Sequence, residues 1–476
     1  MQNANELING ISKSFFAPQP SENGVPPHVL RRAMRFCAHN PDAPQCKEHP
    51  ELNVQGALPD NGGGAIDLGE VFPGLARFHL PPIPRMSIVN VLQNVPKDLV
   101  SALPPSFGSK INQAIKGTLL KLCANGQCKQ QDAETLNVRA TIAEREAAIH
   151  RQLSPGLDQN RVDQEIETRI ARTQQLKQAM LKKAGLDTQI DAKDNGVFQN
   201  DILLTEDQAN RLINQVNNPD TNAVVMPSGR RKRSAIYLEE NGARKWPTNR
   251  PIQYMFDPQL SATEQQQINL AIREIQSKTC VKFQQVSSRP SGNFIYYSKW
   301  TVGGFCGLSH IGMKTPGPNL IYLSFNCGNQ PGIALHETLH ALGLNHEQLR
   351  GDRDQFLTIN WQNVDPKQYD FFAMADAREF TSYGIKYDYG SVMHYNQFIN
   401  TGQPTMSANI NPGTNNPLMG QRNGLSQSDI QLVKKMYCLP ANCVDSNVYC
   451  GSWANRDLCG GSTWLQTNCK KSCNRC

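Results

Sequence analysis

Several features that would place this chain in other classes of protein are absent. The sequence has no run of about 18 apolar residues, so we expect no membrane-spanning helix. Its net charge at pH 7 is only +7, and residues 234–476 hold 21 basic and 17 acidic side chains of the 48 and 41 in the whole chain. Neither half of the chain has a large excess of basic side chains, so nucleic acid is not an expected partner. The chain also has no Asn-x-Ser/Thr sequence, so we expect no N-glycosylation.

The usual features of a signal peptide are missing from the first thirty residues, which hold neither a basic start nor a continuous apolar stretch. The 14 cysteines, an even number, favour an oxidising compartment, because disulfides form and persist there. We therefore expect a secreted, extracellular protein whose leader lies upstream of this sequence.

The most informative segment has the pattern HExxHxxGxxHE. His336 and His340 are four residues apart in a helix-forming run and share one helix face, where both imidazoles can bind one metal ion. Gly343 permits a left-handed turn that brings His346 back to the same ion. Glu337 is placed beside the metal as a general base, which takes a proton from zinc-bound water and passes it to the leaving amine. The pattern predicts a zinc peptidase with one Zn²⁺ per chain.

A lone HExxH pattern also occurs by chance in ordinary helices, and two further constraints argue against chance. Gly343 and His346 stand at the required offsets, and the pattern SVMHY follows at 391–395. The rival hypothesis is a non-catalytic extracellular binding protein with a structural zinc site. Glu337 argues against it, because a structural site needs no general base and usually fills its fourth position with protein.

These motifs, with RGDRD at 350–354, resemble those of the astacin family of the metzincins over roughly residues 235–438. The resemblance implies an α+β zincin fold with a mixed sheet, an active-site helix and a loop-rich lower half. It also implies endopeptidase activity on protein or peptide substrates. Met393 would form an apolar floor under the metal. Tyr395 would be an extra zinc ligand that swings away to stabilise the oxyanion, with a buried core tyrosine as the alternative.

The resemblance further implies activation by cleavage. The basic run Arg230, Arg231, Lys232 and Arg233 resembles a site for a furin-like convertase of the secretory pathway. Cleavage after Arg233 would leave a mature chain that begins at Ser234 or Ala235. In astacins the new amino terminus is buried near the glutamate that follows the third histidine, which is Glu347 in this sequence.

Astacin prosegments commonly carry an FxGD motif whose aspartate occupies the water position on zinc. The related run in this chain is Phe198-Gln199-Asn200-Asp201, with Asn200 in place of glycine. Asparagine tolerates a positive φ, so we expect the turn to form and Asp201 to be a metal ligand of the latent form only. A solvent-exposed loop aspartate is the alternative.

Six cysteines in the last 34 residues indicate a disulfide-held module, because so short a segment cannot bury enough apolar surface to fold otherwise. The module resembles an ShK-type (ShKT) domain, which implies the pairs Cys443–Cys476, Cys450–Cys469 and Cys459–Cys473. The ShK-type domain is named after a sea-anemone toxin that blocks potassium channels with a lysine. The loop at 460–468 has no lysine, so Trp464 is interpreted as a packing or protein-contact residue. The partner of this module is not identified by the sequence.

The remaining cysteines form two groups. Astacin resemblance implies the pairs Cys280–Cys438 and Cys306–Cys327 in the peptidase segment. The close spacing of Cys37, Cys46, Cys123 and Cys128 suggests two local loops, although four cysteines allow three connectivities. The expected domains are a prosegment at 1–233, a peptidase domain at 234–439 and a ShKT domain at 443–476. This combination resembles nematode astacins and implies extracellular matrix proteins as substrates.

Coarse secondary structure completes the expected layout. Residues 17–85, rich in proline, glycine and asparagine, predict disorder, whereas residues 133–185 predict two amphipathic helices with a break at 154–156. Glu146 interrupts the apolar stripe of the first helix. These helices could cover the cleft or bind a partner, and the prosegment could also have a regulatory role after release.

In the peptidase segment, a capping box at 261–264 opens a helix, strands are expected at 252–256, 293–298 and 320–325, and a last helix is expected at 426–437. Arg422 lies in a stretch similar to one of the astacin family. It would line the pocket for an acidic residue after the scissile bond, or it would be a structural arginine.

Overall fold

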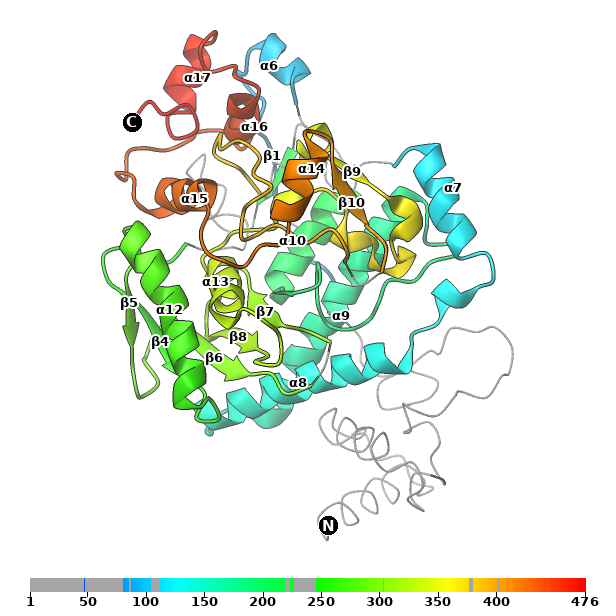
Figure 1. Cartoon of the computed structure of the whole chain (residues 1–476), viewed down its shortest axis with the longest axis vertical. Coiled ribbons are helices and arrows are strands. Elements are labelled where there is room, and N and C mark those ends of the chain that lie inside the picture. Colours follow the sequence, from blue (N-terminus) through cyan, green and yellow to red (C-terminus); the bar gives the residue numbers. More distant parts are fainter. Residues whose placement is uncertain are drawn as a thin grey trace.

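The computed structural model describes residue 47 and residues 80–84, 87–103, 111–218, 223–226, 245–302, 304–375, 380–399 and 402–476 (Figure 1). The basic run at 230–233, the first mature residue, Cys37, Cys46 and, apart from residue 47, residues 17–79 of the stretch predicted to be disordered lie outside these ranges. No helix in the described part of the chain is long and apolar enough to cross a membrane.

A six-stranded mixed sheet organises the centre of the molecule. Its strand order is β2(Ile202–Leu203), β7(Gly307–His310), β8(Asn319–Leu323), β6(Ile295–Lys299), β4(Ile252–Phe256) and β5(Phe283–Gln285). Strands β7 and β8 are antiparallel, and the other neighbours are parallel. The mixed sheet agrees with the expected α+β fold, and the strands expected near 252, 293 and 320 are present within two residues of their predicted limits.

Helices cover both faces of this sheet. Because side chains alternate along a strand, Ile295 and Tyr297 of β6 pack into one core while Tyr296 packs into another. The first core contains α12(Ala262–Lys278) and α13(Gln330–Ala341), and α12 begins at the expected capping box of Ser261 and Glu264. The second core contains Val138, Ile142 and Ile149 of α8(Ala133–Leu153), which runs along the bottom of the sheet in Figure 1. The predicted prosegment therefore supplies one layer of the fold.

The two helices predicted between residues 133 and 185 are present as α8 and α9(Gln159–Ala184), and the break falls at 154–158. Glu146, which interrupts the apolar stripe of α8, is buried and forms an ion pair with Arg169 of α9 at 2.8 Å. The other elements that the structure describes in the predicted prosegment are β1(Ser87–Asn90), α6(Lys97–Ser101), α7(Gln113–Leu122), η2(Gln127–Lys129), α10(Glu206–Asn217) and β3(Ala223–Met226), with β1 and β3 antiparallel. A disulfide joins Cys123 to Cys128, so this pair closes a local loop.

The lower half is built from short elements. These are η3(Glu347–Leu349), η4(Arg353–Gln355), β9(Leu357–Ile359), η5(Trp361–Asn363), η6(Pro366–Phe371), β10(Met406–Ala408), α14(Pro412–Asn415) and η7(Asn416–Leu418). The predicted last helix of the peptidase is α15(Gln427–Tyr437), and Cys438 at its end is bonded to Cys280. The C-terminal module holds α16(Cys450–Asn455) and α17(Thr463–Asn468). The structure contains Cys306–Cys327 and the three pairs that the resemblance implies for the module.

Candidate metal centre

Helix α13 and the turn after it place three histidines around one point. His336 and His340 lie one turn apart near the end of α13. Gly343 follows the helix with φ 103°, and its N–H donates to the His340 carbonyl at 2.7 Å, so the chain reverses at once. His346 then returns to the helix face, and all three histidines are at most 2% exposed. The local pattern and the glycine together build the expected ligand set.

The orientation of the three rings fits a metal ion. Nδ1 of His336 lies 2.8 Å from the Val392 carbonyl, and Nδ1 of His340 lies 2.8 Å from the Leu344 carbonyl. These two contacts assign the protons of His336 and His340 to Nδ1 and leave their Nε2 lone pairs facing one another. Nε2 of His340 is 3.1 Å from Nε2 of both His336 and His346. Lone pairs at this separation repel, and a cation bound at roughly 2.0–2.1 Å from each nitrogen removes the repulsion.

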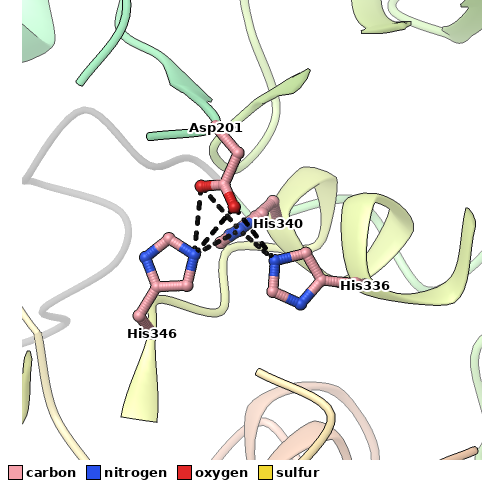
Figure 2. A group of neighbouring side chains, drawn as sticks. All are labelled: Asp201, His336, His340 and His346. Carbon is pink, nitrogen blue, oxygen red and sulfur yellow. Dashed lines mark hydrogen bonds and ion pairs between the residues drawn. The ribbon is translucent and has the colours of Figure 1, made fainter. Parts of the chain in front are cut away.

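Asp201 of the predicted prosegment completes the group, as Figure 2 shows. Its Oδ1 lies 3.0 Å from Nε2 of His346 and 3.6 Å from Nε2 of His340, and its Oδ2 lies 3.3 Å from Nε2 of His336. Burial favours the neutral acid, but the close contacts with the imidazoles, that with His346 first, hold the pKa of Asp201 well below its usual value. Burial lowers the pKa of His336 to about 3 and that of His346 to about 4, so these rings are neutral, as metal ligands are.

Comparison with known proteins agrees with this geometry. The astacin family of peptidases matches residues 238–438, and an ShK domain-like family matches residues 442–476. The chain is 40% identical over 482 residues to zinc metalloproteinase nas-10 of Caenorhabditis elegans, covering 99% of this chain and 86% of that protein. The chain belongs to the astacin family. It is also 37% identical to nas-11 of the same organism, over 94% of this chain and 80% of that one.

Among solved structures, high choriolytic enzyme 1, a hatching enzyme zinc-protease of the medaka Oryzias latipes, is 32% identical over 40% of this chain and 90% of its own, with a TM-score of 0.34. Membership of the astacin family makes the present chain a zinc metalloproteinase. The chain also has a C-terminal ShK-like domain. The three histidines with Asp201 are the residues that would hold its zinc ion.

A tight turn presents Asp201 to the histidines of this astacin. The backbones of Phe198 and Ile202 exchange two hydrogen bonds, of 2.9 and 3.0 Å, around the residues between them. Asn200 has φ 76°, as expected from its tolerance of positive φ, and Gln199 has φ 50°. The N–H of Ser309 in β7 donates to the Asp201 carbonyl at 2.9 Å, so β2 extends the edge of the peptidase sheet directly after the turn.

Tyr395 contacts this turn. Its hydroxyl donates to the carbonyl of Gln199, and its ring centroid lies 4.3 Å from that of His346. Asp370 accepts from the N–H of Gln199 at 2.8 Å, so both backbone groups of this residue are bound by the peptidase domain. His394 lies between the Tyr395 carbonyl and the Tyr387 hydroxyl, at 2.7 and 2.8 Å, and packs as expected.

Glu337 is buried beside the histidines. No hydrogen-bond partner of its Oε2 lies within the described residues. Burial and the charge of Asp201 raise the pKa of Glu337 well above its usual value, and Arg422 opposes this shift. Gly307 of β7 packs against the carboxylate so closely that a Cβ there would lie 2.2 Å from Oε1. No sequence motif signals this role of Gly307, because the contact spans 30 residues.

The turn at 391–395 supports the ligands from below. Met393 is 2% exposed, and the carboxylate of Asp429 accepts from the Ser391 hydroxyl at 2.6 Å and the Val392 N–H at 2.9 Å. The sequence indicates Asp429 only as part of the cap of α15. It does not indicate that Asp429 also holds the turn at 391–395. Nη1 of Arg422 donates to the carbonyls of Val392 and His394 at 2.9 and 3.2 Å. These bonds favour the structural interpretation of Arg422.

Glu347 faces a cavity of about 370 Å³ that Asn345, Asp429 and Asn455 also line. Its Oε1 accepts from the Asp388 N–H at 2.9 Å and from Nη1 of Arg350 at 3.0 Å. Burial raises the pKa of Glu347 to about 7, opposed by the charge of Arg350. Asn455 belongs to the C-terminal module, so the module closes one side of this cavity.

Proposed function

We propose that this astacin is a secreted, latent endopeptidase in which residues 1–233 block the active site until cleavage after Arg233. The single observation that carries the proposal is the Asp201 carboxylate among the three histidines, with both oxygens within 3.6 Å of their Nε2 atoms. A carboxylate held there occupies the coordination position that water needs for catalysis. Asp201 is thus the proposed latch, and the proposed ligand set of the active form is His336, His340 and His346, with Tyr395 as the extra ligand that swings away during catalysis.

Two further contacts support the block. Strand β2 pairs with β7, the sheet edge to which an extended substrate would add. The Tyr395 hydroxyl is bound to the Gln199 carbonyl and is therefore withheld from substrate. Loss of the prosegment would free the edge, the hydroxyl and the metal position together, because one turn of chain occupies all three.

In the proposed mechanism, His336, His340 and His346 would hold a zinc ion, which would supply the Lewis-acid polarisation that makes water nucleophilic at neutral pH. Glu337 takes one proton from the attacking water as the new C–O bond forms, and returns it to the amine nitrogen as the C–N bond breaks. Tyr395 donates a hydrogen bond to the oxyanion. Arg422 and Asp429 hold the turn at 391–395, against which the His336 ring is oriented.

Activation is proposed to use a furin-like convertase at Arg230, Arg231, Lys232 and Arg233. The new amino terminus would enter the cavity beside Glu347, whose carboxylate is the acidic group suited to bind an ammonium. Extracellular matrix proteins are the proposed substrates, with a preference for Asp or Glu after the scissile bond. The disulfides in the peptidase domain and the module support export to an oxidising compartment.

The test is peptide hydrolysis by the full chain before and after cleavage at the basic run, with Glu337→Gln as the matched control. We expect activity only after cleavage and separation of the prosegment, its loss with a zinc chelator, and a decrease of at least about 10²-fold in the variant. Strong activity of the uncleaved chain would refute the latch. Zinc-loaded, folded and inactive protein in every form would instead favour the non-catalytic binding protein.

Asp201→Ala tests the latch itself. The uncleaved variant should hydrolyse a short peptide that the uncleaved wild type does not, because the carboxylate no longer fills the metal position. Asp207→Ala changes an exposed aspartate six residues later in α10 and should stay inactive until cleaved. Equal inactivity of the uncleaved Asp201→Ala and Asp207→Ala chains would assign latency to β2 and the turn alone.

A further inference from the structure

The C-terminal module contacts the prosegment as well as the peptidase domain. Residues 87–103 lie at the opposite end of the molecule from α8, and Figure 1 places α6 beside α16 and α17. Nε1 of Trp453 donates to the Leu99 carbonyl at 2.9 Å, and Nδ2 of Asn447 donates to the Val91 carbonyl at 2.7 Å. The two contacting segments are more than 340 residues apart in sequence. The prosegment therefore wraps around the molecule.

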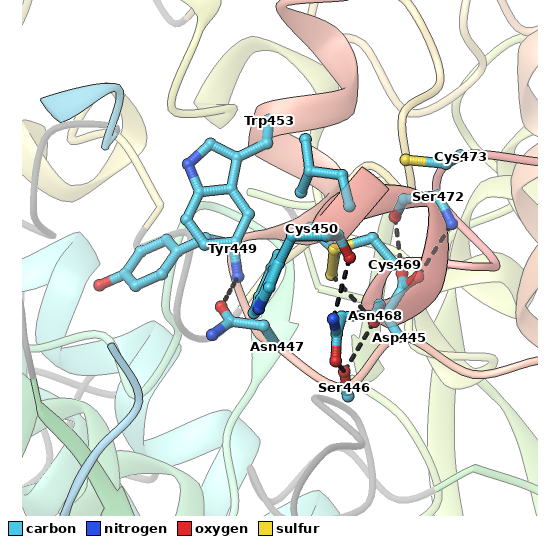
Figure 3. The surroundings of a disulfide bond; sticks show 12 residues. Asp445, Ser446, Asn447, Tyr449, Cys450, Trp453, Asn468, Cys469, Ser472 and Cys473 are labelled. Atoms are coloured by element: carbon cyan, nitrogen blue, oxygen red, sulfur yellow. Dashed lines mark hydrogen bonds between the residues drawn. A yellow bond between two sulfur atoms is a disulfide. The ribbon is translucent and has the colours of Figure 1, made fainter. Parts of the chain in front are cut away.

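The contact surface is the apolar core of the module itself. Leu99 is 1% exposed and lies in one cluster with Tyr449, Trp453 and Leu465. Figure 3 shows Tyr449 and Trp453 on the side of the module away from Cys473. Partly buried side chains of the same prosegment segment pack against this cluster, namely Val91, Leu92, Val95, Ala102 and Leu103. A module of this size has little apolar surface to bury, so Leu99 is a substantial addition to its core.

The segment depends on this contact for its order. Helix α6 has five residues, Lys97–Ser101, which is too short to be stable alone in water. Leu99 is its one buried residue, and the cluster that buries it is completed by the module and by residues 91–103. Conversely, the indole N–H of the fully buried Trp453 has its hydrogen bond to the prosegment. Each side therefore satisfies groups that the other leaves open.

We propose that the ShK-like module anchors the prosegment. The module binds residues 91–103 through Trp453, Tyr449 and Asn447. This inference rests on the proposed role of residues 1–233 as a removable prosegment. The latch at Asp201 and the anchor at Leu99 then hold the prosegment at two distant places. Cleavage at the basic run separates the chain but leaves both contacts in place, so the prosegment stays bound as a non-covalent inhibitor until the anchor is released.

The first test uses hydrogen exchange of the uncleaved full chain, which requires neither cleavage nor activity. Leu99→Glu places a charge in the apolar cluster and leaves the module sequence intact. We expect peptides that cover residues 97–103 and 447–455 to exchange at least about tenfold faster, while α9 is unchanged. Leu157→Glu is the matched control, because Leu157 is 50% exposed in the break between α8 and α9. Unchanged exchange in Leu99→Glu overturns the anchor.

The second test follows release of the prosegment after convertase cleavage. Cleaved wild type should elute as one complex, and Leu99→Glu should release its prosegment at a lower urea concentration than Leu157→Glu. Equal release of the two variants overturns the proposal. If Leu99→Glu does not fold, Leu99→Ala takes its place with the same expected direction. Cleaved protein from which the prosegment has been separated, and which is folded and zinc-loaded but still does not hydrolyse peptide, would refute the proposed function and leave the anchor supported.

Discussion

Gly307 packs directly against the Glu337 carboxylate in the active site. There is no room for a side chain at position 307. In Gly307→Ala the new Cβ would lie 2.2 Å from Oε1 and 2.6 Å from Cγ of Glu337, so the carboxylate must move. We expect kcat of the cleaved enzyme to fall by about 10²-fold, because a displaced base loses most of its contribution.

The control for this substitution is Gly413→Ala in α14, where an added Cβ meets nothing within 4 Å. It should keep wild-type kcat. Thermal unfolding of both variants separates displacement of the base from loss of the fold. A Gly307→Ala enzyme with unchanged kcat would contradict the positioning role of this glycine.

At the residue scale, prediction from sequence works where contacts are local. His336, His340 and His346 fall within eleven residues, so helical periodicity and one glycine suffice to bring them together. Gly307 and Asp370 reach the site from other elements, 30 residues from Glu337 and 171 residues from Gln199. No pattern in one sequence records such contacts, and only the fold shows them.

At the scale of elements, the buried ion pair between α8 and α9 makes a stability prediction. Burial alone would raise the pKa of Glu146, but Arg169 and Lys314 lower it to about 2. A depressed carboxylate pKa stabilises the fold above the unfolded value of about 4.5, and that stabilisation is lost as the pH falls towards about 2. Glu146→Gln should lower the free energy of unfolding at pH 7 by about 3 kcal/mol, because Arg169 is left buried without its partner.

Urea unfolding between pH 2 and pH 7 measures both effects. The variant should also lose much of the pH dependence below pH 4.5. Glu165→Gln breaks the exposed Arg161–Glu165 pair and should change stability little. Equal urea midpoints for Glu146→Gln and Glu165→Gln would show that the buried pair does not stabilise the prosegment helices.

The helices and strands with strong periodicity were predictable, but their neighbours were not. The apolar stripes of α8 and α9 and the capping box of α12 were readable from sequence. Strand β2 has two residues and β7 has four, too few for a periodic signal, yet they connect the latch to the sheet. Glu146 interrupts the apolar stripe of α8. Its ion pair could not be predicted from that stripe, because its partner, Arg169, is on the next helix.

At the scale of the whole molecule, the prosegment should control access to the metal. Three histidines and Asp201 form a buried four-residue group in the uncleaved chain, whereas three histidines remain after release. We therefore expect zinc loss to a chelator to be at least about tenfold slower before cleavage than after removal of the prosegment. A chromogenic zinc indicator measures both rates. Equal rates would show that Asp201 does not contribute to metal retention.

The order of the three regions along the chain was predicted from cysteine groups and motifs, and the family matches cover residues 238–438 and 442–476. The packing of the regions could not be predicted in the same way. That α8 covers the second face of the peptidase sheet, and that Leu99 enters the module, depends on contacts between distant segments. Apolar residues at those positions predict burial, but they do not identify the segments that bury them.

The pairing of β2 with β7 also concerns solubility. While β2 is in place, its two residues pair with Ser309 and His310 of β7, and the Ser309 N–H donates to the Asp201 carbonyl. The departure of β2 turns β7 into an open sheet edge, which can recruit a strand from any neighbouring molecule. While the prosegment is bound, the two-residue β2 forms this end of the sheet, so we expect edge-to-edge association to increase when β2 leaves and the four-residue β7 is open.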